Sequence, residues 1–317
     1  MKPQTAGPAH TPAQSDAVRW GILGTARIAR RLVPAMHASR NGRVVAVASR
    51  DLNRAQAFAR EFNLPRAYGS YEALLADPEV DAVYIPLPNH LHHPWTLRAL
   101  AAGKHVLCEK PLALTSQEAE EMAAAARSHN RVLMEAVMYR FHPRMEEAQR
   151  LVASGAIGVP QVVRSTFTFH FYDPADYRYR REMGGGALLD VGVYCITAAR
   201  MMLAGDPVFA AARGVWDPAT EVDVTEAVVL GFPEGRMATF VSSFALDPHA
   251  SIEVLGTEGR MFLEEPWVPE DRAWPIVIRR QGREEHIPTP AADHYRLMVE
   301  HFGDAVMGRA PLRYPPE

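Results

Sequence analysis

The 317-residue sequence has little cysteine, no long apolar run and no charge surplus of either sign. Its two cysteines, Cys108 and Cys195, are too few for a disulfide framework, and neither has a partner at metal-ligand spacing. We expect both to be buried thiols. No run of apolar residues approaches the roughly 18 that a membrane-spanning helix needs. The 34 basic and 37 acidic side chains leave a formal charge of −3, which argues against a nucleic-acid binder.

The first sixteen residues differ in composition from the rest of the chain. Met1–Asp16 is rich in proline, alanine, threonine and glutamine, and it lacks the basic start and apolar core of a signal peptide. We therefore expect residues 1–16 to form a disordered tail on a cytoplasmic protein. The remaining length fits two domains of roughly 150 residues each.

Between residues 17 and 137, short apolar runs alternate with longer amphipathic stretches. The expected strands are Val18–Leu23, Val44–Ala48, Ala82–Ile85, His105–Leu107 and Val132–Met134. The expected helices are Ala26–Ala38, Leu52–Glu61, Pro94–Ala102 and Ser116–Arg127. Short strands joined by helices predict a parallel sheet covered on both faces, as in an α/β Rossmann dinucleotide-binding domain.

Residues 138–317 have a different pattern, in which long strands dominate. The expected strands are Val159–Phe171, Val208–Trp216, Val222–Phe232, Arg236–Phe244 and Ser251–Leu255. Helices are expected over Pro143–Ala153, over residues 186–204 and over residues 294–307. This pattern predicts an α+β domain with a mostly antiparallel open sheet and helices on one face. We expect the other face to expose alternating Val, Phe and Leu side chains, which is typical of an interface.

The first strand leads into a turn with the spacing of a dinucleotide-binding fingerprint. Gly24 takes the tight turn, Ala26 faces the pyrophosphate in place of the usual second glycine, and Ala29 stands where helix meets strand. The turn residues expected to bind a dinucleotide through their N–H groups are Gly24, Thr25, Ala26, Arg27 and Ile28. An ordinary strand-to-helix turn is the alternative.

The tip of the second strand indicates which dinucleotide is bound. An NAD enzyme normally carries Asp or Glu there, whereas this chain has Ser49 and Arg50, with Arg54 one helical turn further on. A hydroxyl and a guanidinium suit a 2′-phosphate, so we expect NADP, with NAD also possible. The alternative is a helix N-cap at Ser49 or Asp51 beside a solvated arginine.

Two further motifs stand at predicted strand ends. Residues 88–93 contain three histidines after the Ala82–Ile85 run, but they lack a second ligand pair, so we expect no metal. The Glu109-Lys110-Pro111 sequence follows a buried run, where lysine is rare unless it is paired or functional. A triple glycine, residues 184–186, precedes a helix on which Asp190 and Tyr194 share one face.

The order of these motifs resembles the Gfo/Idh/MocA oxidoreductases. The resemblance is carried by Gly24-Thr25-Ala26, by residues 105–111 and by residues 184–190, and it runs from about residue 19 to residue 309. Tyrosine at 194, where many members carry histidine, is similar to the branch that includes glucose–fructose oxidoreductase, dimeric dihydrodiol dehydrogenase and D-xylose 1-dehydrogenase. Residues 135–143 and 177–182 also look like segments of that branch.

The resemblance implies roles for residues at the predicted sheet edge. Lys110, Tyr194 and Asp190 would be catalytic. Tyr194 would be the acid/base, its pKa lowered by the nearby lysine, and Lys110 would bind the reacting oxygen. Asp190 would either orient substrate hydroxyls or tune the lysine–tyrosine pair. The further cofactor contacts would be Pro86, Leu87, Asn89, His92, Glu109, Lys110, Arg140, Tyr177 and Arg178. The candidate substrate residues are His142, His170 and Arg181. A cis Lys110–Pro111 peptide bond and pairing of subunits through the C-terminal sheet are also implied.

The expected activity is therefore NADP-dependent hydride transfer between nicotinamide and a sugar or related polyol or diol. Two alternatives remain from the sequence. One is an NAD(P)-dependent glycosidase on the same fold, and the other is a cofactor-sensing binding protein without turnover. Release of sugar from an aryl glycoside, or cofactor binding without oxidation of any polyol, would distinguish them.

Overall fold

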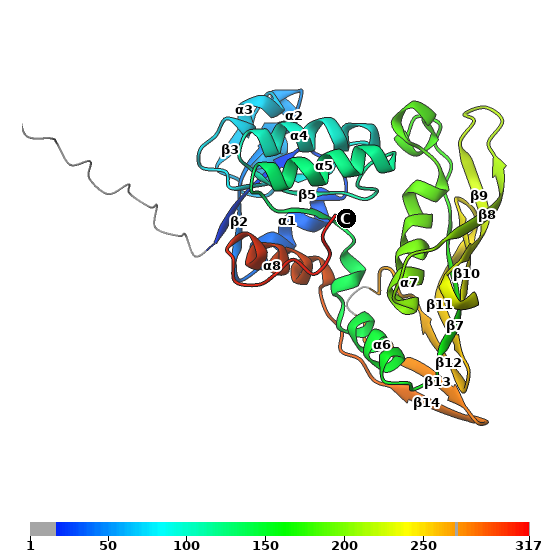
Figure 1. The fold of residues 1–317 in the computed structure, drawn as a ribbon. Helices are drawn as coiled ribbons and strands as arrows, with labels where there is room; N and C mark the ends of the chain where they lie inside the picture. Colours follow the sequence, from blue (N-terminus) through cyan, green and yellow to red (C-terminus); the bar gives the residue numbers. More distant parts are fainter. Residues whose placement is uncertain (1–16, 270–271, 317) are drawn as a thin grey trace, which may run out of the picture.

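The structure, a computed structural model, describes residues 17–269 and 272–316. The tail expected over residues 1–16 lies outside this range. The described chain folds into a parallel-sheet unit and a larger-sheet unit that lie side by side (Figure 1). This is the predicted combination of a Rossmann fold with a mostly antiparallel sheet.

The first unit is a six-stranded sheet in the order β3-β2-β1-β4-β5-β6, and every adjacent pair is parallel. Its strands are β1 (Val18–Leu23), β2 (Gly42–Ala48), β3 (Arg66–Tyr68), β4 (Ala82–Ile85), β5 (His105–Cys108) and β6 (Leu133–Glu135). Its helices are α1 (Ala29–Ala38), α2 (Leu52–Glu61), α3 (Tyr71–Leu75), α4 (His92–Ala101) and α5 (Ser116–Ser128). The residues of β1 and β4 are almost all buried because helices cover both faces of the sheet.

One helix in this unit begins three residues later than predicted, and two short elements were not predicted. The helix expected from Ala26 begins at Ala29, because the preceding residues form the turn itself. The short elements β3 and α3 were not predicted. Strand β3 has only three residues, too few for an alternating pattern to emerge, and α3 has five.

The second unit is an eight-stranded sheet in the order β14-β13-β12-β11-β7-β10-β9-β8. Only the β10–β7 pair is parallel. The strands are β7 (Pro160–His170), β8 (Phe209–Trp216), β9 (Asp223–Gly231), β10 (Met237–Ser243), β11 (Ala245–Gly256), β12 (Gly259–Glu264), β13 (Ile276–Arg280) and β14 (Arg283–Ile287). Helices α6 (Pro143–Ala153) and α7 (Val193–Leu203) lie on the face that looks toward the first unit (Figure 1).

The last helix returns to the first unit. Helix α8 (His294–Val306) packs beside α1, and the rings of Trp20 and Phe302 lie 5.0 Å apart. The Asn41 side chain donates to the Glu300 carbonyl at 2.7 Å. The sequence prediction assigns residues 138–317 to the second domain. In the structure, the C-terminal helix α8 of that segment packs on the nucleotide-binding unit.

The outer face of the large sheet is more mixed than predicted. Exposed apolar side chains gather at the β8–β10 end and include Phe209 and Val229, as expected. At the β11–β12 side, however, Arg164 and Arg260 form ion pairs with Glu253 on the same surface. The expectation of alternating apolar residues throughout is thus wrong for that half of the sheet.

A buried carboxyl group on the inner face of this sheet predicts pH-dependent stability. Glu226 is 7% exposed, its Oε2 has no hydrogen-bond partner among the described residues, and burial raises its pKa to about 7. The contribution of this group to the unfolding free energy should therefore be lost as the pH rises from about 4.5 to about 7, by about 1–3 kcal/mol, and should stay constant above pH 7. Chemical denaturation of the wild type and of Glu226→Gln from pH 5 to 8 measures this. A variant with the same pH slope as the wild type would contradict it.

Candidate active site

The carboxyl ends of β1, β2, β4 and β5 bring four predicted motifs to one edge of the sheet. Gly24 follows β1, Ser49 follows β2, Leu87 follows β4 and Lys110 follows β5. In open parallel sheets, ligands bind at this edge where the strand order reverses, here between β1 and β4. The sequence motifs and the topology therefore point to the same surface.

The turn after β1 has the geometry of a phosphate cradle. Gly24 has φ +109°, a conformation that favours glycine, and a Cβ there would lie 3.0 Å from Leu87 Cδ2. Within the described residues, the N–H groups of Ala26, Arg27 and Ile28 have no hydrogen-bond acceptor. Free N–H groups ahead of a helix are a ready site for an anionic phosphate.

The residues after β2, Ser49 and Arg50, form a cationic corner with Arg54 of α2. Ser49 is buried and its Oγ accepts from the Asp51 N–H at 3.3 Å, while Asp51 caps α2 by accepting from Asn53. The capping alternative is thus confirmed for Asp51, and it leaves the exposed Arg50 guanidinium unused by the cap.

Tyr71 completes this corner and was not predicted from the sequence. Burial raises the pKa of its phenol, and the cations of Arg50 and Arg54 oppose that rise because they lie close by. The Tyr71 hydroxyl also lies 3.8 Å from the position of a Cβ on Gly24. Two guanidinium groups and a hydroxyl therefore stand next to the phosphate turn.

Lys110 is bound to the second unit through Asp190. The Lys110–Pro111 peptide bond is cis, as the resemblance implied. Lys110 Nζ donates to Asp190 Oδ1 at 2.7 Å and to the Asp190 carbonyl at 2.6 Å. Asp190 lies in a π-helical turn, Leu188–Gly192, which joins directly to α7. Such turns are frequent at functional sites.

The charges in this cluster stabilise one another. Burial raises the pKa of the Asp190 carboxyl, but Lys110 and Arg178 outweigh it and hold the pKa at about 2. Burial lowers the pKa of the Lys110 ammonium, but Asp190 more than offsets it, so the net pKa is raised. Both groups are therefore charged at neutral pH.

Tyr194 lies against the same cation. Lys110 Nζ is 5.3 Å from the centroid of the Tyr194 ring, which also stacks on Tyr139 at 5.6 Å. The Tyr194 hydroxyl contacts Met138 Sδ at 3.7 Å, a weak acceptor that leaves the hydroxyl available. The expectation that lysine lowers the pKa of Tyr194 is wrong: burial raises it well above 10, so the phenol is neutral at pH 7.

Comparison with known proteins identifies this arrangement. A family model described as "Oxidoreductase family, NAD-binding Rossmann fold" matches residues 18–137, and one described as "GFO/IDH/MocA C-terminal domain" matches residues 145–262. The chain belongs to the Gfo/Idh/MocA oxidoreductase family.

Relatives in this family carry out sugar and diol chemistry. D-xylose 1-dehydrogenase (NADP(+)) 2 of Haloferax volcanii is 41% identical over 291 residues, 90% of this chain and 88% of that one. Trans-1,2-dihydrobenzene-1,2-diol dehydrogenase of Mus musculus is 38% identical over 284 residues, 88% and 83% of the two chains. A 3-ketoreductase from Actinomadura kijaniata, solved with NADP and TDP-benzene, has a TM-score of 0.90 at 34% identity and covers 95% of this chain and 93% of its own.

Two polar side chains that follow β4, His92 and Asn89, hold backbone segments around the site. His92 is fully buried, and its ring nitrogens contact the carbonyls of Pro111 at 2.7 Å and Leu87 at 2.8 Å. Asn89 donates to the Gly184 carbonyl at 2.8 Å and so links the two units. These hydrogen bonds hold the Lys110–Pro111 turn and the glycine loop in place, and contact of both residues with the cofactor stays a prediction. Pro86 precedes them at the same strand end.

Glu109 precedes Lys110 and is half-buried. Its carboxylate accepts from the Tyr84 hydroxyl at 2.5 Å and from the Lys110 N–H at 3.3 Å. Burial raises the pKa of Glu109, while Lys110 lowers it in part. Tyr84 was not predicted, because a tyrosine inside a buried strand has the sequence pattern of a core residue.

The three candidate substrate residues are not gathered at Lys110. His142 is 1% exposed and caps α6 by accepting from the Arg144 N–H, so its Nδ1 is occupied. His170 lies on the outer sheet face, because alternation along β7 places Phe167 inward against Tyr194. Arg181 is exposed and pairs with Glu221 at 3.3 Å.

Arg140 also lies apart from the cluster. Its guanidinium stacks on the Tyr314 ring at 4.6 Å, near the C-terminal segment. Tyr177 and Arg178, in contrast, do join the Lys110 cluster, since burial and the Asp190 charge raise the pKa of Tyr177 to about 12. Of the residues placed by resemblance, the structure thus brings together those from the β5 end and from residues 177–194.

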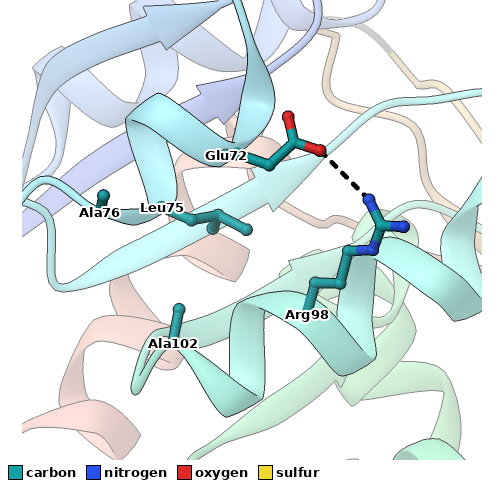
Figure 2. A pocket seen from close by; sticks show the side chains of 5 residues that line it. All are labelled: Glu72, Leu75, Ala76, Arg98 and Ala102. Carbon is teal, nitrogen blue, oxygen red and sulfur yellow. Dashed lines mark hydrogen bonds and ion pairs between the residues drawn. The ribbon is translucent and has the colours of Figure 1, made fainter.

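A surface depression and a long apolar stretch are two further features of the described chain. Figure 2 shows a depression between α3 and α4, bridged by the Glu72–Arg98 ion pair at 3.2 Å. Its lining is mostly aliphatic and it holds no buried polar group. Residues 181–203 are long and apolar enough to cross a membrane, but 67% of the apolar 18-residue window within them is buried inside the protein, which is typical of a core helix. Within the described ranges, no cluster of three His, Cys, Asp or Glu side chains has metal-binding geometry.

Proposed function

We propose that this protein is an NADP-dependent oxidoreductase that transfers hydride between nicotinamide and the CH–OH carbon of a sugar or a related polyol or diol. The observation that carries the proposal is the Lys110–Asp190–Tyr194 cluster beside the nucleotide-binding edge. The sugar, diol and ketosugar activities named for the relatives support this substrate class.

The residues present fit NADP. The free N–H groups of Ala26, Arg27 and Ile28 would hold the pyrophosphate, and Ser49, Arg50 and Arg54 would hold the 2′-phosphate. When bound, the cofactor supplies the hydride donor or acceptor. The Arg50 guanidinium has no ion pair with an acidic side chain among the described residues and lies within hydrogen-bond reach of the Tyr71 phenol, so its other N–H groups can donate to a phosphate.

Lys110 would hold the reacting oxygen through one N–H group. An ammonium has three donors, and Asp190 accepts two of them. The third remains for a substrate oxygen, where a positive charge stabilises developing alkoxide character. Asp190 therefore orients the ammonium rather than the substrate.

Tyr194 would move the proton. A neutral phenol donates its proton to a carbonyl oxygen as that carbon is reduced, which leaves a phenolate. In the reverse direction that phenolate, and not the neutral phenol, takes the proton of the alcohol. The weak contact to Met138 costs little to break. Aromatic rings around Tyr194, including Phe167 at 5.2 Å, exclude water from this proton transfer.

A substrate panel tests the proposal. Aldoses, inositols and diols are incubated with NADP⁺ or NAD⁺, and formation of the reduced cofactor is followed by absorbance. We expect NADP⁺ reduction with at least one member of this class. Release of sugar from an aryl glycoside without net cofactor reduction, or cofactor binding without turnover on any member, would overturn it.

We further propose a cytoplasmic homodimer that pairs through the outer face of the large sheet. Exposed Val208, Phe209, Val229 and Met237 form an apolar surface at the β8–β10 end, and no described helix covers it. The two free, buried cysteines suit a reducing compartment.

Light scattering should give twice the chain mass of 35.1 kDa. Val229→Asp, in the middle of this apolar surface, should shift the protein toward monomer. Leu52→Asp, an equally exposed apolar position in the nucleotide-binding unit, should not. A monodisperse wild-type monomer would refute the dimer.

A further inference from the structure

We infer that Arg178 is a positioning residue for Lys110. It binds one oxygen of the Asp190 carboxylate and leaves only the other oxygen for the lysine. Arg178 Nε donates to Asp190 Oδ2 at 2.8 Å, while Lys110 Nζ donates to Oδ1 at 2.7 Å. Each cation thus holds one oxygen of the same buried carboxylate. This inference rests on the proposed function and assigns Arg178 a role other than the cofactor contact expected from the sequence.

Contacts other than Asp190 also fix the position of Arg178. Its guanidinium is 4.8 Å from the Tyr177 ring centroid, and Arg178 Nη1 lies 3.2 Å from Asp176 Oδ1. Asp176 also accepts from the Arg178 N–H at 3.0 Å. Backbone, ring and carboxylate therefore all fix this side chain in one place.

The glycine loop explains how Arg178 comes so close to the π-helical turn. The Gly186 N–H donates to the Arg178 carbonyl at 2.9 Å. A Cβ on Gly185 would lie 2.5 Å from the same carbonyl, and one on Gly186 would lie 1.9 Å from Asp223 Oδ1. A side chain at Gly185 would push the Arg178 turn away, and one at Gly186 would collide with Asp223.

The sharing of the Asp190 carboxylate between Arg178 and Lys110 has two consequences for Lys110. The carboxylate is prevented from turning both oxygens to the ammonium, so the third N–H stays free for substrate. Because Arg178 shares the Asp190 carboxylate, it also weakens the attraction of that carboxylate for the ammonium, so the lysine pKa is raised less than it would be by Asp190 alone. The groups facing Lys110 include Asp190, Tyr177, Glu109, His92, Tyr295 and the Tyr194 ring.

Loss of Arg178 should therefore change Lys110 without changing cofactor binding. With Arg178→Gln, Asp190 would turn wholly to Lys110, raising the lysine pKa and occupying its third N–H. We expect kcat on the best panel substrate to fall by about 10- to 100-fold, as for loss of one charge-assisted hydrogen bond. The alkaline limb of the pH profile should move upward, and the Kd for NADPH, from fluorescence, should stay within about twofold.

A measurement without substrate separates this inference from the proposed function. The pH dependence of Lys110 acetylation by acetic anhydride, read by peptide mass spectrometry, reports the lysine pKa directly. It should move upward in Arg178→Gln even if no panel member is turned over. Arg178→Lys should recover part of the shift in both profiles, and Arg180→Gln, which removes an exposed neighbouring cation, should behave as wild type.

Two results would overturn the inference. One is an Arg178→Gln protein with an NADPH Kd at least tenfold weaker and unchanged kcat, which would make Arg178 a cofactor contact. The other is an unchanged Lys110 titration. If Arg178→Gln fails to fold by circular dichroism, Asp176→Asn loosens Arg178 less severely and should give a smaller shift of Lys110 in the same direction, and no shift would count against the inference.

Discussion

Replacing Tyr194 with phenylalanine should lower kcat by about 10²- to 10⁴-fold, because the ring stays and only the proton-donating hydroxyl is lost. The Kd for NADPH should stay near the wild-type value. Lys110→Met should also lower kcat, since it removes the one N–H left over from Asp190. Steady-state kinetics on the best panel substrate measure both effects.

The double variant tests whether the two groups act together. If Tyr194 and Lys110 act on one oxygen, the loss in the double variant should be smaller than the product of the single losses. Thermal unfolding of each variant provides the control, because Tyr194 packs against Tyr139 and Phe167. A Tyr194→Phe enzyme with unchanged kcat would show that this helix is not catalytic.

Replacing Arg50 with alanine should weaken NADP⁺ binding by about 10- to 100-fold, the loss expected for a charge-assisted contact to phosphate. The Kd for NAD⁺ should change by no more than about threefold, because NAD⁺ lacks the 2′-phosphate. Titration calorimetry with both nucleotides measures the change in preference. Arg60→Ala, on the exposed end of α2, is the matched control. Wild-type protein that binds NAD⁺ as tightly as NADP⁺ would contradict this assignment of the corner.

The nucleotide-binding half of the site could be predicted because its signals are local. Gly24, Ser49 and Lys110 each follow a short apolar run, and the carboxyl ends of parallel strands meet at one edge whatever the loops do. The second half depends on long-range packing. The Arg178–Asp190 contact requires the glycine loop to fold back, and nothing in the spacing of residues 178 and 190 specifies it.

The candidate substrate residues lie away from Lys110 for different reasons. His170 could have been placed outward from the sequence, because Phe167 and Phe169 mark the inner face of β7 two residues apart. His142 stands directly before Pro143, a typical N-cap position, and that pattern also favours a structural role. Tyr71 carried no signal, since α3 is a single short helix whose position depends on the sheet.

Direct transfer of hydrogen between substrate carbon and cofactor is the central claim, and isotope transfer tests it. The best panel substrate, deuterated at the reacting carbon, is incubated with NADP⁺, and the reduced cofactor is analysed by mass spectrometry. We predict deuterium in the NADPH formed by the wild type, and a label-transfer rate at least about 100-fold lower in Lys110→Met. Unlabelled NADPH from the wild type, or equal label transfer by Lys110→Met, would contradict the account.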